Sequence, residues 1–123
     1  MNRIEIEIGG KLRTFIFGFG FLGEILDYLD TNVEGLGKMM DRNPFKVIPA
    51  ILYFGHKSEL EITGRPVDFT FNDACTWVEE MENSYAHPDI EKVLNHMISS
   101  MRKNVPGLDE VYTHMEKEES KKK

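Results

Sequence analysis

The chain has 123 residues, of which 41% are hydrophobic and 29% are charged. This is the length of a single domain with a globular composition, so a disordered chain is excluded and folding needs neither a metal nor a disulfide. The net charge of −6 argues against a nucleic-acid or anionic-membrane partner, since both bind basic surfaces. The one cysteine, Cys75, excludes an internal disulfide and fits a reducing compartment.

The sequence shows no targeting signal. Residues 1–8 alternate glutamate with isoleucine, whereas a signal peptide has a basic start and an unbroken apolar stretch. The longest apolar stretches are well below the roughly 18 residues that a membrane-spanning helix needs. We therefore expect a soluble, cytosolic protein.

Residues 2–17 have the pattern of an antiparallel β-hairpin. Isoleucine and glutamate alternate up to Ile8, which indicates one apolar and one solvated face. Gly9-Gly10 suits a two-residue turn that places Ile8 opposite Lys11. An isolated hairpin is marginally stable in water, so helices must cover its apolar face. That face consists of Ile4, Ile6, Ile8, Phe15 and Phe17.

Helical patterns follow over residues 20–103. Apolar residues recur at helical spacing over residues 21–29, with acidic residues on the opposite side. Thr31 and Glu34 have the spacing of a capping box and predict the start of a short second helix.

Asn43-Pro44 predicts the N-cap and first turn of a third helix, which we expect to end near Gly55. Pro49 is expected to kink this helix or to shift its start. The polar residues 56–68 are interpreted as a loop.

Two further helices are predicted before a charged tail. Thr70 and Asp73 indicate an N-cap, and Pro88 opens the most regular apolar pattern of the chain, with His87 as its cap. We therefore predict a mainly α fold in which the hairpin packs on a bundle of about five helices. This domain spans residues 1–103, and residues 104–123 are expected to form a flexible charged tail.

The run GFGFLG fits the G-x-G-x-x-G dinucleotide fingerprint at Gly18, Gly20 and Gly23. That motif binds a pyrophosphate only within a parallel βαβ unit, whereas the strand before it here belongs to an antiparallel hairpin. We therefore interpret the glycines as a sharp turn from strand to helix and expect no dinucleotide cofactor.

No residue constellation predicts catalysis. The histidines do not pair at helical spacing, and one cysteine cannot complete a zinc set, so no metal site is expected. Cys75 lies on an apolar helix face and is interpreted as a buried structural thiol. The carboxylates of Glu79, Glu80 and Glu82 are interpreted as a solvated helix face. We conclude that the protein is not an enzyme and uses no cofactor.

The chain is rich in soft apolar side chains, with 7 methionines and 8 phenylalanines. Methionine adapts its shape, and methionine clusters recur on surfaces that bind varied apolar helices. Met97 and Met101 fit a helical core stripe. Four residues fit a core and a partner-binding surface equally well, and these candidates are Met39, Met40, Phe45 and Phe54.

The order of these pieces resembles a known family. The hairpin ends in residues 11–22 (KLRTFIFGFGFL), which lead directly into residues 23–27 (GEILD). Later come residues 43–45 (NPF), residues 48–55 (IPAILYFG) and a threonine-capped helix. Over residues 4–103 this order resembles the tail assembly chaperones of long-tailed bacteriophages and prophages.

The resemblance implies a mostly helical, non-enzymatic assembly factor. Such chaperones bind the tape measure protein, a long apolar helix-rich chain, and recruit the tail tube protein in the bacterial host cytoplasm. They are absent from the mature virion. Many are also made in a longer form by ribosomal frameshifting, and Lys121-Lys122-Lys123 fits either a slippery run of lysine codons or a solvated charged tail.

Alternatives remain open. One is a small acidic protein-binding module of phage origin that regulates a host protein, although its carboxylates are too mixed with lysines for DNA mimicry. A nucleotide-binding enzyme is the weakest alternative. Self-association is also expected to be possible through the hairpin edges, where charged residues limit pairing. Those residues are Glu5, Glu7, Lys11 and Arg13.

Overall fold

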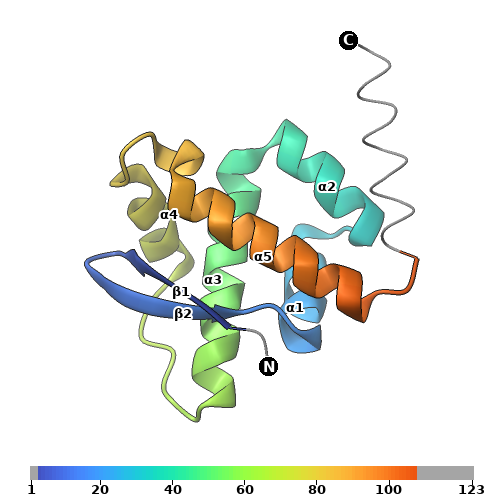
Figure 1. Cartoon of the computed structure of the whole chain (residues 1–123), viewed down its shortest axis with the longest axis horizontal. Coiled ribbons are helices and arrows are strands. Elements are labelled where there is room, and N and C mark those ends of the chain that lie inside the picture. Colours follow the sequence, from blue (N-terminus) through green and yellow to red (C-terminus); the bar gives the residue numbers. More distant parts are fainter. Residues whose placement is uncertain (1–2, 108–123) are drawn as a thin grey trace.

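The computed structural model describes residues 3–107 and confirms the predicted mainly α fold (Figure 1). Of the expected tail, residues 108–123 lie outside this range, and Asn104 still belongs to the last helix. The elements of the described part are β1 (Arg3–Ile8), β2 (Lys11–Ile16), α1 (Phe19–Leu29), α2 (Val33–Arg42), α3 (Pro44–Ile62), α4 (Phe71–Glu79), the 3-10 turn η1 (Ser84–Ala86) and α5 (Pro88–Asn104).

The hairpin has the predicted register, with Ile8 opposite Lys11 and Ile4 opposite Phe15. Gly9 and Gly10 have φ angles of 64° and 82°, which glycine adopts without steric cost. The predicted apolar face is buried throughout. Arg13 also lies on this face, opposite Ile6. Its Nε donates a hydrogen bond to the Ile8 carbonyl oxygen at 3.0 Å.

Helix α3 runs through the middle of the molecule, where α5 crosses it (Figure 1). It continues past Pro49 to Ile62, so the predicted end near Gly55 is wrong and residues 56–62 are helical rather than a loop. The charged side chains of this last part stabilise the helix. The Lys57 Nζ lies 2.6 Å from Glu61 one turn later and 2.6 Å from Glu24 of α1.

Capping residues predicted the starts of α3, α4 and α5 but not those of α1 and α2. Thr70 and Asp73 form a reciprocal capping box, and the His87 Nδ1 accepts a hydrogen bond from the Asp89 backbone N–H at 3.0 Å. The cap of α2 is Asn32 rather than the predicted Thr31, since the Asn32 Oδ1 accepts from the Gly35 N–H at 2.8 Å. Asparagine ranks above threonine as an N-cap residue.

The core lies between the hairpin, α1, α3 and α5. Phe17 leaves the hairpin and enters this core, where its ring meets the edge of Phe21 at a centroid distance of 4.8 Å. Its carbonyl oxygen accepts a hydrogen bond from the Ser100 Oγ at 2.7 Å, which connects the end of the hairpin to α5. Gly55 of α3 lies against the same ring, so a backbone with no side chain lets hairpin and helix approach closely.

Candidate functional site

An exposed pair of aromatic rings lies where α3 begins. Phe45 is the second residue of α3, and its side chain is 73% exposed. Tyr85 of η1 is 45% exposed, and its ring meets that of Phe45 edge to face at 5.7 Å and 90°. Such a contact holds both rings in place without burying them. Large aromatic side chains held at the surface are typical anchors for protein partners.

A small apolar hollow of about 120 Å³ lies beside these two rings. Pro44 and Pro49 frame it from α3. Pro44 is the first residue of the helix, where a backbone N–H has no helical partner, whereas Pro49 lies inside the helix and removes one backbone hydrogen bond. The volume suits one aliphatic side chain of a partner rather than a cofactor. The remaining lining residues are Ile48, Cys75, Val78, Glu79 and Ser84.

Cys75 is half-buried at this hollow rather than fully buried as the sequence predicted. Burial and the nearby Glu79 carboxylate raise the pKa of its thiol. A raised pKa keeps the sulfur protonated, and the thiolate is the nucleophilic form. Cys75 therefore serves this hollow as a small apolar side chain.

The structure separates the four predicted partner-binding residues. Phe45 is exposed, whereas Phe54 is buried in the core, with its ring centroid 5.4 Å from that of Tyr28. Met39 and Met40 are half-buried and pack against the core. Of the four, Phe45 alone presents most of its side chain to a partner.

Tyr85 was not predicted as a site residue. It lies between Ser84 and Ala86 in the connection from α4 to α5, where periodicity gives no signal. An aromatic residue among turn-forming residues was the available indication, because turns are surface segments. Trp77 was also missed, and it stacks on Phe69 at 5.2 Å beneath the Arg13 guanidinium.

A second exposed apolar position lies at the start of α1. Phe19 is 74% exposed and adjoins a hollow of about 290 Å³ together with Ile62 and two carboxylates, Glu24 and Glu61. Gly18 caps α1 with an extended backbone, so the predicted turn from strand to helix is present without a positive φ. The preceding strand is antiparallel to its only partner in residues 3–107, which leaves the glycine motif without a βαβ unit in that range.

His56 is a buried histidine with a structural environment. Its Nδ1 donates to the Thr14 carbonyl oxygen at 2.7 Å, and its ring packs on those of Phe15 and Phe69 at 5.6 Å and 5.0 Å. Burial lowers the pKa of this imidazole, and the nearby Arg13 lowers it further, against the opposing effect of the Thr14 carbonyl. The neutral imidazole is therefore the form that the fold favours.

We predict that acid destabilises the protein through His56. The lowered pKa means that the unfolded chain binds more protons than the folded chain as the pH falls below the ordinary value of 6.5. Stability present above that pH is thus lost on acidification. Urea titrations at about pH 7.5 and about pH 5.5 check this. His56→Gln, which keeps a donor but does not titrate, is expected to lose less stability between the two pH values; an equal loss would contradict the assignment.

The described residues contain neither a metal-binding cluster nor a membrane-spanning helix. Across residues 3–107, no group of three histidine, cysteine, aspartate or glutamate side chains is placed to hold a metal ion. No helix within the same range is long and apolar enough to cross a membrane.

The geometry at Phe45 and Tyr85 thus favours a protein-binding surface over a catalytic centre. Comparisons with protein-family models, with curated proteins and with solved structures found no match to this chain.

Proposed function

We propose that the protein is a tail assembly chaperone of the long-tailed phage type. In this proposal it binds the helix-rich tape measure protein and recruits the tail tube protein in the bacterial host cytoplasm. It acts without catalysis and does not remain in the mature virion. Two things support the proposal: the resemblance over residues 4–103, and an exposed aromatic pair beside an apolar hollow.

The observation that carries the proposal is the exposure of Phe45 at a fixed position. A ring that is 73% exposed forgoes the stabilisation that burying it would supply, which is typical of a residue that is covered by a partner. An amphipathic helix that lies across Phe45 and Tyr85 can place one apolar side chain in the hollow between α3 and α4. The net charge of −6 would keep such a complex soluble.

We predict that Phe45→Ser abolishes capture of the partner while leaving the fold intact. Removing a central aromatic anchor weakens binding by about 30-fold or more, which corresponds to about 2 kcal/mol. The free energy of unfolding should change by no more than about 0.5 kcal/mol, because the side chain is exposed. The measurement is co-expression with a phage tape measure protein, followed by co-purification and an assay of that protein's solubility.

Phe19→Ser is the matched control, since Phe19 has almost the same exposed fraction, 74%, but lies at the start of α1. We expect Phe19→Ser to retain binding. If both variants bind as the parent does, the aromatic pair is not the binding surface. If the captured partner is a host regulatory protein instead of a tail component, the acidic regulatory module is the correct function and the chaperone proposal fails.

A further inference from the structure

The outer edge of β1 carries backbone groups that nothing in the described part of the chain uses. In a hairpin with a two-residue turn, Ile8 and Lys11 form a hydrogen-bonded pair, and bonded pairs then alternate along the ladder. The backbone N–H and C=O groups of Glu5 and Glu7 therefore point away from β2. Within residues 3–107, neither residue forms any other backbone hydrogen bond.

The opposite edge of the hairpin is already bonded at Thr14. The backbone N–H and C=O groups of Thr14 in β2 point away from β1, and the carbonyl oxygen accepts the hydrogen bond from the His56 Nδ1 of α3. The two edges are thus unequal, because Thr14 of β2 already has a partner whereas the backbone groups of Glu5 and Glu7 have none within residues 3–107.

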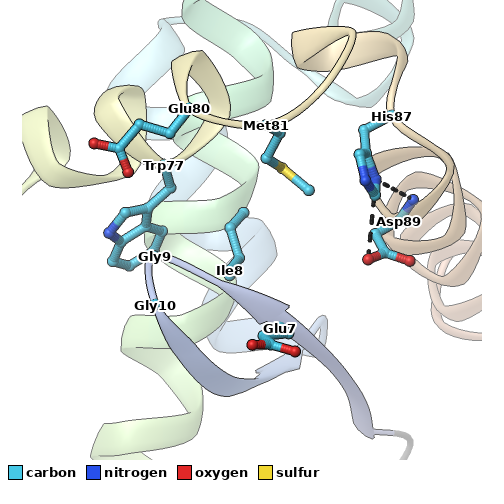
Figure 2. Close-up of a pocket in the computed structure, with 9 residues that line it drawn as sticks. All are labelled: Glu7, Ile8, Gly9, Gly10, Trp77, Glu80, Met81, His87 and Asp89. Carbon is cyan, nitrogen blue, oxygen red and sulfur yellow. Dashed lines mark hydrogen bonds and ion pairs between the residues drawn. The ribbon is translucent and has the colours of Figure 1, made fainter.

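An open hollow of about 360 Å³ adjoins the end of this edge, between the hairpin turn and the connection from α4 to α5 (Figure 2). Glu7 and Glu80 are among its lining residues, and neither forms an ion pair within residues 3–107. Asp89 adds a third carboxylate, 3.9 Å from the His87 Nδ1. The residues that line the hollow thus include three acidic side chains and no lysine or arginine.

Part of the lining of this hollow is apolar. Ile8 and Met81 face it, and the edge of the Trp77 indole closes it beside Gly9 and Gly10 (Figure 2). Along β1, buried isoleucines alternate with exposed charged residues. A strand added beside β1 would have the same alternation, because side chains of neighbouring strands share faces.

We propose that the edge of β1 binds an extended partner segment in which lysine or arginine alternates with apolar residues. The segment adds as a third strand to the hairpin and hydrogen bonds to the backbone of Glu5 and Glu7. Its basic side chains lie beside the carboxylates of Glu7 and Glu80, and its apolar side chains lie beside Ile8 and Met81. This inference does not rest on the chaperone proposal, since it uses a different surface from Phe45.

A second copy of this chain fits the edge less well. Pairing two β1 strands brings Glu5 and Glu7 of both copies together, and the one cation of the strand, Arg3, is already paired with Glu59 at 2.7 Å. Like charges on facing strands destabilise a sheet. A basic partner has the opposite effect. Charge complementarity therefore selects a cationic peptide as the occupant.

Trp77 fluorescence can report peptide binding, because Trp77 is the one tryptophan of the chain and lines the hollow. The probe is a synthetic peptide of about seven residues that alternates lysine and valine, titrated into the full-length protein. We expect a change in Trp77 fluorescence and slower amide hydrogen exchange at Glu5 and Glu7. N-methylation of the peptide amides that face β1 should abolish both effects, whereas N-methylation of the alternate amides should not.

The charge contribution is tested with Glu7→Gln/Glu80→Gln, which we expect to weaken binding by about tenfold or more. The control Glu34→Gln/Asp41→Asn removes the same charge from α2 and should bind as the parent does. Equal binding by the two N-methylated peptides, or by a glutamate–valine peptide, would overturn the proposal. So would sedimentation of the free protein as a dimer that binds no peptide, because a second copy would then occupy the edge.

Discussion

Phe17→Ala is expected to lower the free energy of unfolding by about 3–5 kcal/mol. The side chain is 1% exposed and contacts both Phe21 and α3, so its removal loses apolar burial and leaves a cavity that the surrounding helices cannot fill. A loss of this size in a domain of this length lowers Tm by more than about 10 °C. Chemical denaturation and calorimetry measure both quantities.

Phe17→Leu keeps this prediction testable if the alanine variant does not fold, and we expect it to lose about 1–2 kcal/mol. Phe19→Ala is the control for removal of a phenylalanine from the same part of the chain, and it should stay within about 0.5 kcal/mol of the parent. A Phe17→Ala variant that is as stable as Phe19→Ala would show that the ring does not contribute to the core.

The second large effect on the free energy of unfolding is expected for Gly55→Ala. We expect this substitution to destabilise the protein, although helix propensity alone would favour alanine. Alanine is a better helix former than glycine by about 1 kcal/mol, so Gly55→Ala would stabilise an isolated α3. In the protein, the added Cβ would lie 2.6 Å from the Phe17 Cε1 and 3.4 Å from the Phe15 Cδ1. Both rings are fully buried and cannot move aside freely, so we expect a net destabilisation of about 1–3 kcal/mol.

Gly23→Ala is the matched control within a helix. No atom lies within 4 Å of the position where its Cβ would be, so it should stabilise the protein by about 0.5–1 kcal/mol. The Gly55 effect should also depend on Phe17. In a Phe17→Ala background the space is free, and Gly55→Ala should lose most of its penalty, which a double-mutant cycle measures. Additive effects of the two substitutions would contradict the proposed contact.

Local sequence signals predicted the elements but not all of their lengths. Strict alternation and Gly9-Gly10 were sufficient for the hairpin and its register, because a two-residue turn allows one pairing. Capping residues located the starts of α4 and α5, where Thr70 and His87 each supply an acceptor to a free backbone N–H. Asn43-Pro44 located the start of α3 without a side-chain cap hydrogen bond. The second half of α3 was missed because its charges suggested a loop. Those charges pair with α1 and β1, and no local pattern shows such partners.

The candidate site was predictable only in part. Phe45 was a candidate because it did not fit a single apolar stripe. Phe54 was a candidate for the same reason, yet it is buried. Which of the two is exposed depends on the packing of α1 and α4 against α3. Tyr85 becomes the partner of Phe45 only when the chain from α4 to α5 folds back over the start of α3.

By itself, the sequence determined an acidic, mainly helical domain with an N-terminal hairpin, because alternation, capping and turn residues act over a few neighbouring positions. The tertiary structure decided which apolar side chains remain at the surface and which edge of the hairpin stays open. Both depend on contacts between segments far apart in the chain, such as His56 with Thr14 and Phe45 with Tyr85. The fold also brings acidic residues from three separate segments together, since Glu7, Glu80 and Asp89 line one hollow beside the hairpin turn.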